Sequence, residues 1–220
     1  MPRIARIVVP GHPHHITQRG NYRQTVFVKD TDYAFYLQRL NEYIVRHKLS
    51  ILAYCLMPNH VHFVCIPEHE HSLARTLNAC HMRYAHYFNK KRRLTGHLWQ
   101  GRFYSCVLDD DHFYAAVRYI ENNPVRAKLV KKPYEWKWSS AQDHQGEGRG
   151  ILSLADINHF MEVDDWSDYL SEKEKEKVIK DIRMHTLNGR PLGNSAFIAK
   201  LEDLYGKRLK ALPRGRPKKK

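Results

Sequence analysis

The sequence predicts an α+β fold built on a ferredoxin-like antiparallel sheet, and two observations lead to this expectation. Short apolar runs of strand length alternate with segments whose apolar residues recur at helical spacing, in the order β-α-β-β-α-β, and a further helix follows. The turn at Pro58-Asn59 leaves no room for a helix between two of the runs, which indicates a hairpin. Folds of this kind carry many functions, so the order alone indicates no chemistry.

Four segments have the length and composition of strands. The first lies between Pro13 and Gly20, and the two runs around Pro58-Asn59 are the arms of the hairpin. The fourth follows Gly96. The expected strands are 14–20, 51–57, 60–66 and 97–108.

Three further segments have the apolar spacing of amphipathic helices: 30–48, 72–92 and 109–124. We expect Asp30 or Thr31 to cap the first helix and Ser72 to cap the second, because short polar side chains satisfy free N–H groups there. Acidic residues open the third helix, and Pro124 is expected to stop it near Asn123.

The composition changes after about residue 130. Trp136 and Trp138 stand in a loop-like stretch and are expected to pack back on the body, while 162–185 and 194–209 are expected to be helical. The chain therefore divides into a main domain over 1–140, a helical extension over 141–209 and a basic tail over 210–220.

The chain of 220 residues carries a formal net charge of +14, which is typical of proteins that meet an acidic partner. Nucleic acid is the commonest such partner, and an anionic membrane surface is the alternative. No segment approaches the ~20 apolar residues that a membrane span needs. The four cysteines form no CxxC pair, so we expect buried, reduced thiols and a cytoplasmic, nucleoid-associated protein.

The C-terminal end is the most basic part of the chain. Residues 207–220 hold eight Lys or Arg and no acid, and removing these eight from +14 leaves +6 for the other 206 residues. Within this end, Arg214 and Arg216 flank a glycine in a unit that resembles an AT-hook, which lays arginines in a narrow minor groove. A disordered tether without sequence preference is the alternative. Both would bind duplex DNA.

Two histidines lie one residue apart in the third expected strand. Because residues i and i+2 of a strand point to the same face, His60 and His62 project side by side. Two neighbouring imidazoles can share a divalent metal. The alternative is chance, since the chain has 15 histidines.

The third expected helix offers a partner for that pair. Tyr119 and Asn123 are four residues apart and therefore share one helical face. An asparagine oxygen with two imidazoles would make a mixed N/O site suited to Mg²⁺ or Mn²⁺, with Tyr119 beside the metal. The alternative is a surface tyrosine and an asparagine that ends the helix.

At these residues the sequence resembles a known family. The stretch MPNHVHFVCI (57–66) is similar to the His-hydrophobic-His motif of the HUH single-tyrosine, IS200-like transposases, and RYIENNPVRAKLV (118–130) is similar to their tyrosine helix. The stretches QRGNYRQTVF (18–27) and LWQGRFYS (98–105) resemble one branch, the REP-associated tyrosine transposases. The C-terminal stretch NGRPLGNSAFIAKLE (188–202) resembles the same branch.

The resemblance implies a catalytic domain over 1–140 that cuts and rejoins single-stranded DNA at hairpin-forming repeats through a 5′-phosphotyrosine intermediate. It implies that Tyr119 is the nucleophile and that His60 and His62 hold the metal. Asn123 matches the position of a third ligand, where many relatives have Gln. Members work as monomers or as dimers, and we favour a monomer because the long C-terminal part could replace a partner.

Basic and aromatic residues flank the matching motifs. Arg19, Arg23, Arg102 and Arg126 are candidates for contacts to phosphate or bases, with ordinary solvated arginines as the alternative. Aromatic candidates for stacking on unpaired bases are Tyr22, Tyr104 and Trp99, although Trp99 is also suited to the core.

Two other functions remain open at the level of sequence. One is a catalytically retired binder of structured single-stranded DNA or RNA, which would need none of His60, His62 and Tyr119. The other is a metal-dependent hydrolase with water as the nucleophile, in which Tyr119 would be dispensable.

Overall fold

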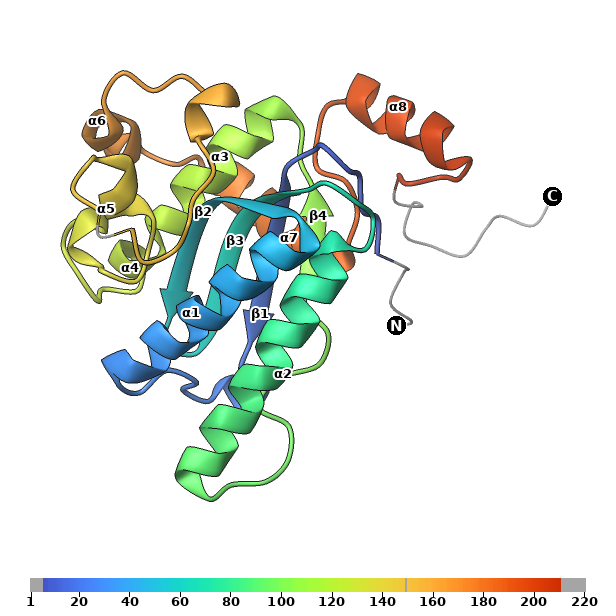
Figure 1. Cartoon of the computed structure of the whole chain (residues 1–220). Helices are drawn as coiled ribbons and strands as arrows, with labels where there is room; N and C mark the ends of the chain where they lie inside the picture. Colours follow the sequence, from blue (N-terminus) through green and yellow to red (C-terminus); the bar gives the residue numbers. More distant parts are fainter. Residues whose placement is uncertain (1–5, 149, 211–220) are drawn as a thin grey trace.

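The computed structural model describes residues 6–148 and 150–210, and a four-stranded antiparallel sheet forms its centre (Figure 1). The strands are ordered β2-β3-β1-β4. They are β1 (His14–Arg19), β2 (Leu49–Met57), β3 (His60–Pro67) and β4 (Tyr104–Val107). Helix α1 (Asp30–His47) joins β1 to β2, and α2 (Ser72–Arg92) joins β3 to β4. The predicted ferredoxin-like order β-α-β-β-α-β is confirmed.

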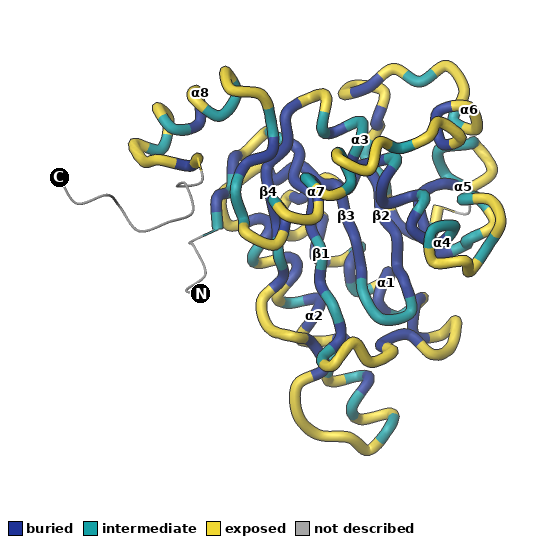
Figure 2. The backbone as a smooth tube through the Cα atoms, turned by 180° about the vertical axis from the view of Figure 1, so that it is seen from behind, coloured by how far each residue is buried: buried dark blue, intermediate teal, exposed yellow. Residues whose placement is uncertain are grey.

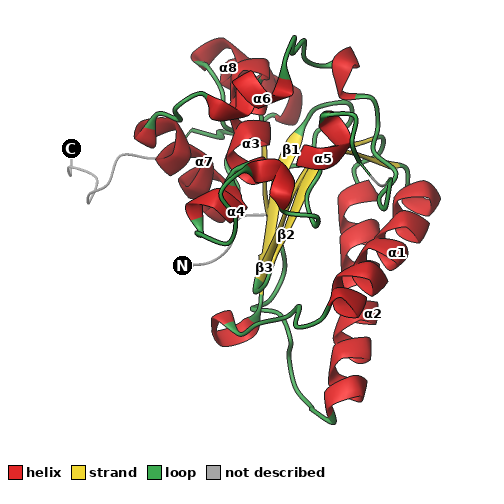
Figure 3. Cartoon of the chain, turned by 90° about the vertical axis from the view of Figure 1, so that its left-hand side faces the viewer, coloured by secondary structure: helices red, strands yellow, loops and turns green. Residues whose placement is uncertain are grey.

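The sheet lies between two layers of helices. Helices α1 and α2 cover one face, and α3 (Asp110–Glu121), α4 (Asn123–Arg126) and α7 (Glu176–Asn188) lie on the other (Figure 3). On β3, Phe63 belongs to the apolar cluster that includes α1 and α2, whereas the neighbouring Val64 belongs to the cluster that includes α3. Because side chains alternate along a strand, both faces of the sheet are packed and its strands are buried (Figure 2).

The second layer contains mostly short helices. It begins with α3 and α4, and α7 packs against β4, β1 and α3. The remaining elements are α5 (Ala141–His144), α6 (Trp166–Ser171), α8 (Ser195–Tyr205) and the 3₁₀ turns Asn21–Arg23, Pro133–Glu135 and Ile157–His159. Within the described residues, no helix is long and apolar enough to cross a membrane.

Four expected elements have clearly different bounds from those that the sequence indicated, and one of them, the helix predicted over 194–209, ends at Tyr205 as α8. The strand predicted over 97–108 pairs regularly only from Tyr104, because Gly101 with its φ of 140° turns the chain just before it. The helix predicted over 109–124 ends at Glu121, and Pro124 stands in the first turn of the separate α4, where its missing N–H costs nothing. The predicted helical segment 162–185 is two helices, α6 and α7, with 172–175 between them.

The predicted caps of the first two helices were wrong, whereas the predicted burial of the cysteines and the packing of the two tryptophans are confirmed. Neither Asp30 nor Thr31 caps α1, whose N-cap is Lys29, and Ser72 lies inside α2 with His71 as its N-cap. All four cysteines are buried free thiols. The tryptophans pack back as expected: Trp138 stacks on Tyr33 with ring centroids 4.7 Å apart, and the Trp136 indole N–H donates to the Leu56 carbonyl.

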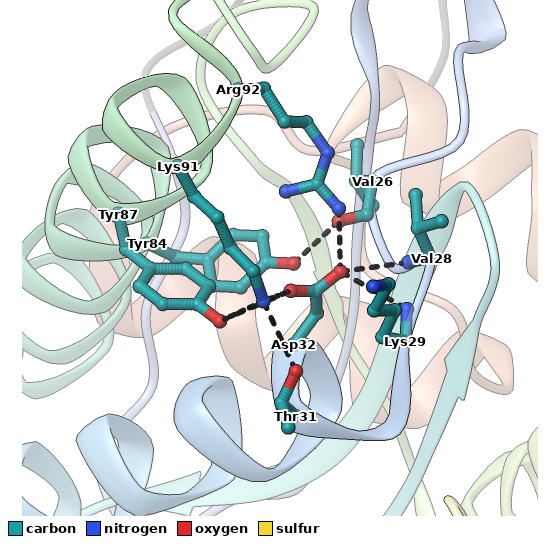
Figure 4. A network of polar contacts seen from close by, with 9 residues as sticks. All are labelled: Val26, Val28, Lys29, Thr31, Asp32, Tyr84, Tyr87, Lys91 and Arg92. Carbon is teal, nitrogen blue, oxygen red and sulfur yellow. Dashed lines mark hydrogen bonds and ion pairs between the residues drawn. The ribbon is translucent and has the colours of Figure 1, made fainter.

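A fully buried carboxylate, Asp32, ties the start of α1 to the end of α2 (Figure 4). It accepts hydrogen bonds from Lys91 at 3.0 Å and Arg92 at 2.7 Å, and also from the Tyr87 hydroxyl and the backbone N–H groups of Val28 and Lys29. Burial by itself raises the pKa of Asp32, but these donors outweigh it and hold the pKa well below its ordinary value. The carboxylate therefore stabilises the folded chain as an anion.

We expect Asp32→Asn to lower the free energy of unfolding at pH 7 by about 2 kcal/mol, because two charge-assisted hydrogen bonds are lost in a buried site. A carboxyl whose pKa is depressed by folding stabilises above its unfolded pKa, near ~4, and less as pH falls below it. The difference between wild type and variant, measured by urea unfolding, should therefore shrink between about pH 5 and pH 3. Asp30→Asn is the control, since Asp30 pairs with Lys137 at the exposed surface. An equal difference at pH 7 and pH 3 would contradict this account.

Candidate active site

A cavity of about 470 Å³ opens between β1, β3, α3, α4 and α7. The predicted residues His60, His62, Tyr119 and Asn123 all line it, although they come from three different elements. Of the described residues on its wall, three are arginines and none is Asp or Glu; the arginines are Arg19, Arg126 and Arg183. The cavity wall therefore carries positive charge and suits an anion such as phosphate.

The two imidazoles lie side by side, as the strand spacing predicted. The ring centroids of His60 and His62 are 4.9 Å apart, and the rings are nearly perpendicular. The Nδ1–H of His60 donates to the Asn59 side-chain oxygen at 2.6 Å, while Nδ1 of His62 lies 3.0 Å from Nε2 of His15. Each ring is thus anchored through Nδ1, and Nε2 is the nitrogen left for a ligand.

Burial keeps both imidazoles neutral. It lowers the pKa of His60 to about 3, helped by the charge of Arg19, and it lowers the pKa of His62 well below the ordinary value. Burial also lowers the pKa of His15 to about 3. Neutral imidazole is the form that binds a metal ion, so the pair can do so at neutral pH.

The buried Tyr119 stands beside the histidines. Its ring meets the His62 ring edge-on at 5.7 Å, and the Arg126 guanidinium lies over the ring at 4.4 Å from its centre. The Nε–H of Arg183 donates to the Tyr119 hydroxyl oxygen at 3.2 Å. Because arginine can only donate, the hydroxyl proton of Tyr119 must point away from Arg183.

Asn123 is buried, and its side chain already takes part in a hydrogen bond. Its side-chain oxygen accepts a hydrogen bond from Arg126 at 2.7 Å, and its side-chain nitrogen has no partner among the described residues. Arg126 also donates to the Tyr119 carbonyl and to the Glu174 carboxylate. To bind a metal ion, the Asn123 side-chain oxygen must use its second lone pair or give up its hydrogen bond to Arg126.

The donor set fits a divalent metal at the histidine pair. Two neutral imidazoles with free Nε2 atoms are suitable ligands for Mn²⁺ and for other transition metals. Among the described residues, no group of three or more His, Cys, Asp or Glu side chains could hold a metal ion, so a third ligand from the protein would have to be of another type. Asn123 and Gln100 are the described wall residues with a side-chain amide oxygen, and Asn123 is the one that the sequence motif indicated.

The other predicted DNA contacts have different surroundings. Arg19 lines the cavity, Arg23 is exposed on the 3₁₀ turn Asn21–Arg23, and Arg102 is exposed before β4. Arg126 lines the cavity, but its guanidinium is held within the protein as described above. The tail residues Arg214 and Arg216 lie outside the described residues.

The three aromatic candidates also differ. Trp99 is buried and its indole N–H donates to the His81 carbonyl, so it belongs to the core. Tyr104 lines the cavity, and Tyr22 is 92% exposed.

Three residues of the site escaped the sequence analysis: His15, Arg183 and Thr186. His15 could have been noticed, because it alternates with Thr17 and Arg19 on one face of the first strand. Arg183 and Thr186 are three residues apart on α7 and both face the cavity. Their sequence spacing gives no sign that α7 reaches Tyr119, which lies 64 residues before Arg183, or His15, which lies 171 residues before Thr186.

Comparison with known proteins places the chain in a family. The sequence model of the IS200-like transposases matches residues 9–123, which include His60, His62, Tyr119 and Asn123. The chain belongs to this family. As a member it is a DNA transposase, and the predicted family is confirmed.

Two solved structures resemble the transposase. One is a REP-associated tyrosine transposase bound to a REP hairpin, with 20% sequence identity, a TM-score of 0.53 and coverage of 74% of this chain and 96% of that one. The other, a protein of Deinococcus radiodurans R1 described as a transposase, has 19% identity, a TM-score of 0.39 and coverage of 55% and 97%. The first supports the fold. Among curated proteins, none matches the chain.

We expect Mn²⁺ to stabilise the transposase through the histidine pair. At about 100 times its Kd, a ligand bound only by the folded state adds about 2.7 kcal/mol, which raises Tm by about 5–10 °C in a chain of this size. His60→Ala and His62→Ala should abolish the shift in thermal unfolding. The control is His159→Ala, which removes an exposed histidine that pairs with Asp156 far along the chain. An undiminished shift in both cavity variants would place the metal elsewhere.

Proposed function

We propose that the transposase cuts and rejoins single-stranded DNA at hairpin-forming repeats, with Tyr119 as the nucleophile. The observation that supports this most is the meeting of His60, His62 and Tyr119 in one cavity with three arginines and no carboxylate among its described wall residues. The similar REP-associated tyrosine transposase was bound to a REP hairpin. A hairpin with an unpaired flank is therefore the substrate class that we propose.

The proposed step exchanges one phosphodiester for another. The Tyr119 oxygen attacks the scissile phosphorus, the P–O bond to the neighbouring 3′ oxygen breaks, and the tyrosine proton ends on the leaving 3′ hydroxyl. The strand downstream of the cut remains joined to Tyr119 through its 5′ phosphate, as a phosphotyrosine. Because the phosphodiester energy is conserved, a 3′ hydroxyl from another strand can reverse the step and complete strand transfer without ATP.

The residues of the cavity meet the electrostatic requirement of this step. A phosphodiester anion repels nucleophiles, and negative charge grows on its oxygens as attack proceeds. Arg19 and Arg183 offer positive charge at the cavity wall, while Arg126 is held over the Tyr119 ring by Glu174 and Asn123. A divalent ion held by His60 and His62, with Asn123 as a third ligand, would supply further polarisation of a phosphate oxygen.

Arg183 has a separate part in the proposal. Its hydrogen bond fixes the Tyr119 oxygen and directs the hydroxyl proton elsewhere in the cavity. No described Asp or Glu lines the cavity to accept that proton. We therefore propose that the proton leaves toward the DNA phosphate or a water molecule, not toward a carboxylate.

The 3₁₀ turn Asn21–Arg23 provides a platform for an unpaired base beside the cavity. Tyr22 and Arg23 have φ of 50° and 58°, a left-handed conformation that costs roughly 1–2 kcal/mol outside glycine. The turn is nevertheless fixed, because the Asn59 amide nitrogen donates to the Arg23 carbonyl while its oxygen accepts from His60. Tyr22 is 92% exposed on this fixed turn. An aromatic ring presented in this way suits stacking on a base.

We also propose that the transposase works as a monomer on DNA in the cytoplasm, at the nucleoid. Arg183 and Thr186 of the same chain complete the cavity around Tyr119 and His15, so one chain contains the whole set of residues that the step needs. A dimer mass in light scattering would contradict the monomer. The tail, with Arg214 and Arg216, is proposed to add affinity for duplex DNA.

Tyr119→Phe should abolish formation of a covalent protein–DNA adduct. The measurement is a denaturing gel after incubation with a labelled single-stranded hairpin and Mn²⁺ or Mg²⁺. Tyr134→Phe is the control, because Tyr134 lies outside the cavity. Cleavage without an adduct that survives Tyr119→Phe would favour the hydrolase, and hairpin binding without cleavage in wild type would favour the retired binder.

Tyr22→Ala should weaken binding of the hairpin with an unpaired flank by about 1–3 kcal/mol, the usual contribution of one base stacked on an aromatic ring. Tyr22→Phe keeps the ring and should bind as wild type does. Fluorescence anisotropy at one fixed salt concentration measures both. A blunt hairpin without the flank should bind both variants equally, and equal loss with both DNAs would argue against stacking.

A further inference from the structure

A chain of hydrogen bonds runs behind His62 into helix α7 of the second layer. Nδ1 of His62 lies 3.0 Å from Nε2 of His15, and Nδ1 of His15 lies 2.7 Å from the Thr186 hydroxyl oxygen. That hydroxyl lies 2.7 Å from the Ile182 carbonyl one helical turn earlier. His15 and Thr186 are each only 1% exposed, so no solvent competes for these bonds.

The direction of every bond in this chain follows from its last member. A carbonyl oxygen only accepts, so the Thr186 hydroxyl donates its single proton to Ile182. The Thr186 oxygen must then accept from His15, which places the His15 proton on Nδ1. Neutral His15 therefore accepts at Nε2, and His62 donates its Nδ1–H. The lone pair of His62 is left on Nε2.

The stacking of the two imidazole rings maintains these hydrogen-bond directions. His15 and His62 stack with centroids 5.2 Å apart and planes only 8° from parallel. His15 lies opposite Val64 in the sheet and His62 lies opposite Thr17, so the two histidines are diagonal neighbours on one face. Rotation of either ring would leave a buried nitrogen unpaired, which is unfavourable.

We infer that His15 and Thr186 are positioning residues which hold His62 in its Nδ1–H tautomer, so that its Nε2 is kept for the metal ion. This inference rests on the proposed function, since it concerns the same metal. His60 is held in the corresponding way by Asn59 from its own strand turn. For His62 the anchor comes from α7, more than a hundred residues later in the chain, and α7 is thereby part of the metal site.

Thr186→Val tests the inference, because valine has nearly the same shape and removes the hydroxyl that orders the chain. Thr186→Ser keeps the hydroxyl and is the matched control. We expect the affinity for Mn²⁺, measured from the electron paramagnetic resonance signal of free Mn²⁺, to fall about tenfold or more with Val and to stay near wild type with Ser. Urea unfolding establishes that both variants are folded under the conditions of the titration.

The tautomer itself can be observed in the wild-type protein without metal. Long-range ¹H–¹⁵N correlation spectra distinguish the Nδ1–H and Nε2–H forms of each histidine, and His62→Ala identifies the signal. We expect Nδ1–H for His62 in wild type and in Thr186→Ser, and a signal shifted toward Nε2–H in Thr186→Val. This readout concerns the ring alone and does not depend on DNA cleavage.

The outcomes separate the inference from the function on which it rests. Wild-type His62 in the Nε2–H form, or equal Mn²⁺ affinity in wild type and Thr186→Val, would overturn the inference and leave the proposed function standing. If wild type binds no Mn²⁺ at this site, the metal-dependent function fails and the inference fails with it. Loss of affinity with Val together with retention by Ser would support both.

Discussion

The antiparallel pairing of β1 with β3 is the interaction on which the candidate active site depends. It places Thr17 opposite His62 and Arg19 opposite His60, so that the polar residues of both strands share one face of the sheet. On the other face, Ile16 meets Phe63 within the core under α1 and α2. A slip of one residue would turn the imidazoles into the apolar core, which is why burial of that core fixes the register.

The second layer of helices then completes a positive, largely buried cavity on the polar face. Helix α3 brings Tyr119, α4 brings Asn123 and Arg126, and α7 brings Arg183 and Thr186. Desolvation keeps the histidines neutral there, while the arginines have few acidic partners and retain positive charge for an anion. Burial of these polar groups costs desolvation free energy. It also strengthens their hydrogen bonds, because the local dielectric constant is low.

Much of this could be predicted from local patterns. The apolar periods of two and of about 3.6 residues predicted the sheet and the long helices, and the i, i+2 spacing predicted that His60 and His62 would lie side by side. Details that depend on neighbouring elements were predicted less well. The expected caps of α1 and α2 were wrong. At α1, Asp32 from inside the helix accepts from the N–H groups of Val28 and Lys29, while Lys91 and Arg92 hold its carboxylate in place. At α2, the Ser72 hydroxyl accepts from the N–H of His69, before the helix.

By itself, the sequence determined the order of the elements, the family, and the candidate residues His60, His62 and Tyr119. Each of these could be recognised because it depends on a contiguous stretch of the chain. Only the tertiary structure decided that His15, Arg183 and Thr186 join them, and that Arg126 binds Asn123 and Glu174. The physical reason is that hydrogen bonds need atoms about 3 Å apart, and such distances between distant segments arise only when the sheet and its second layer pack.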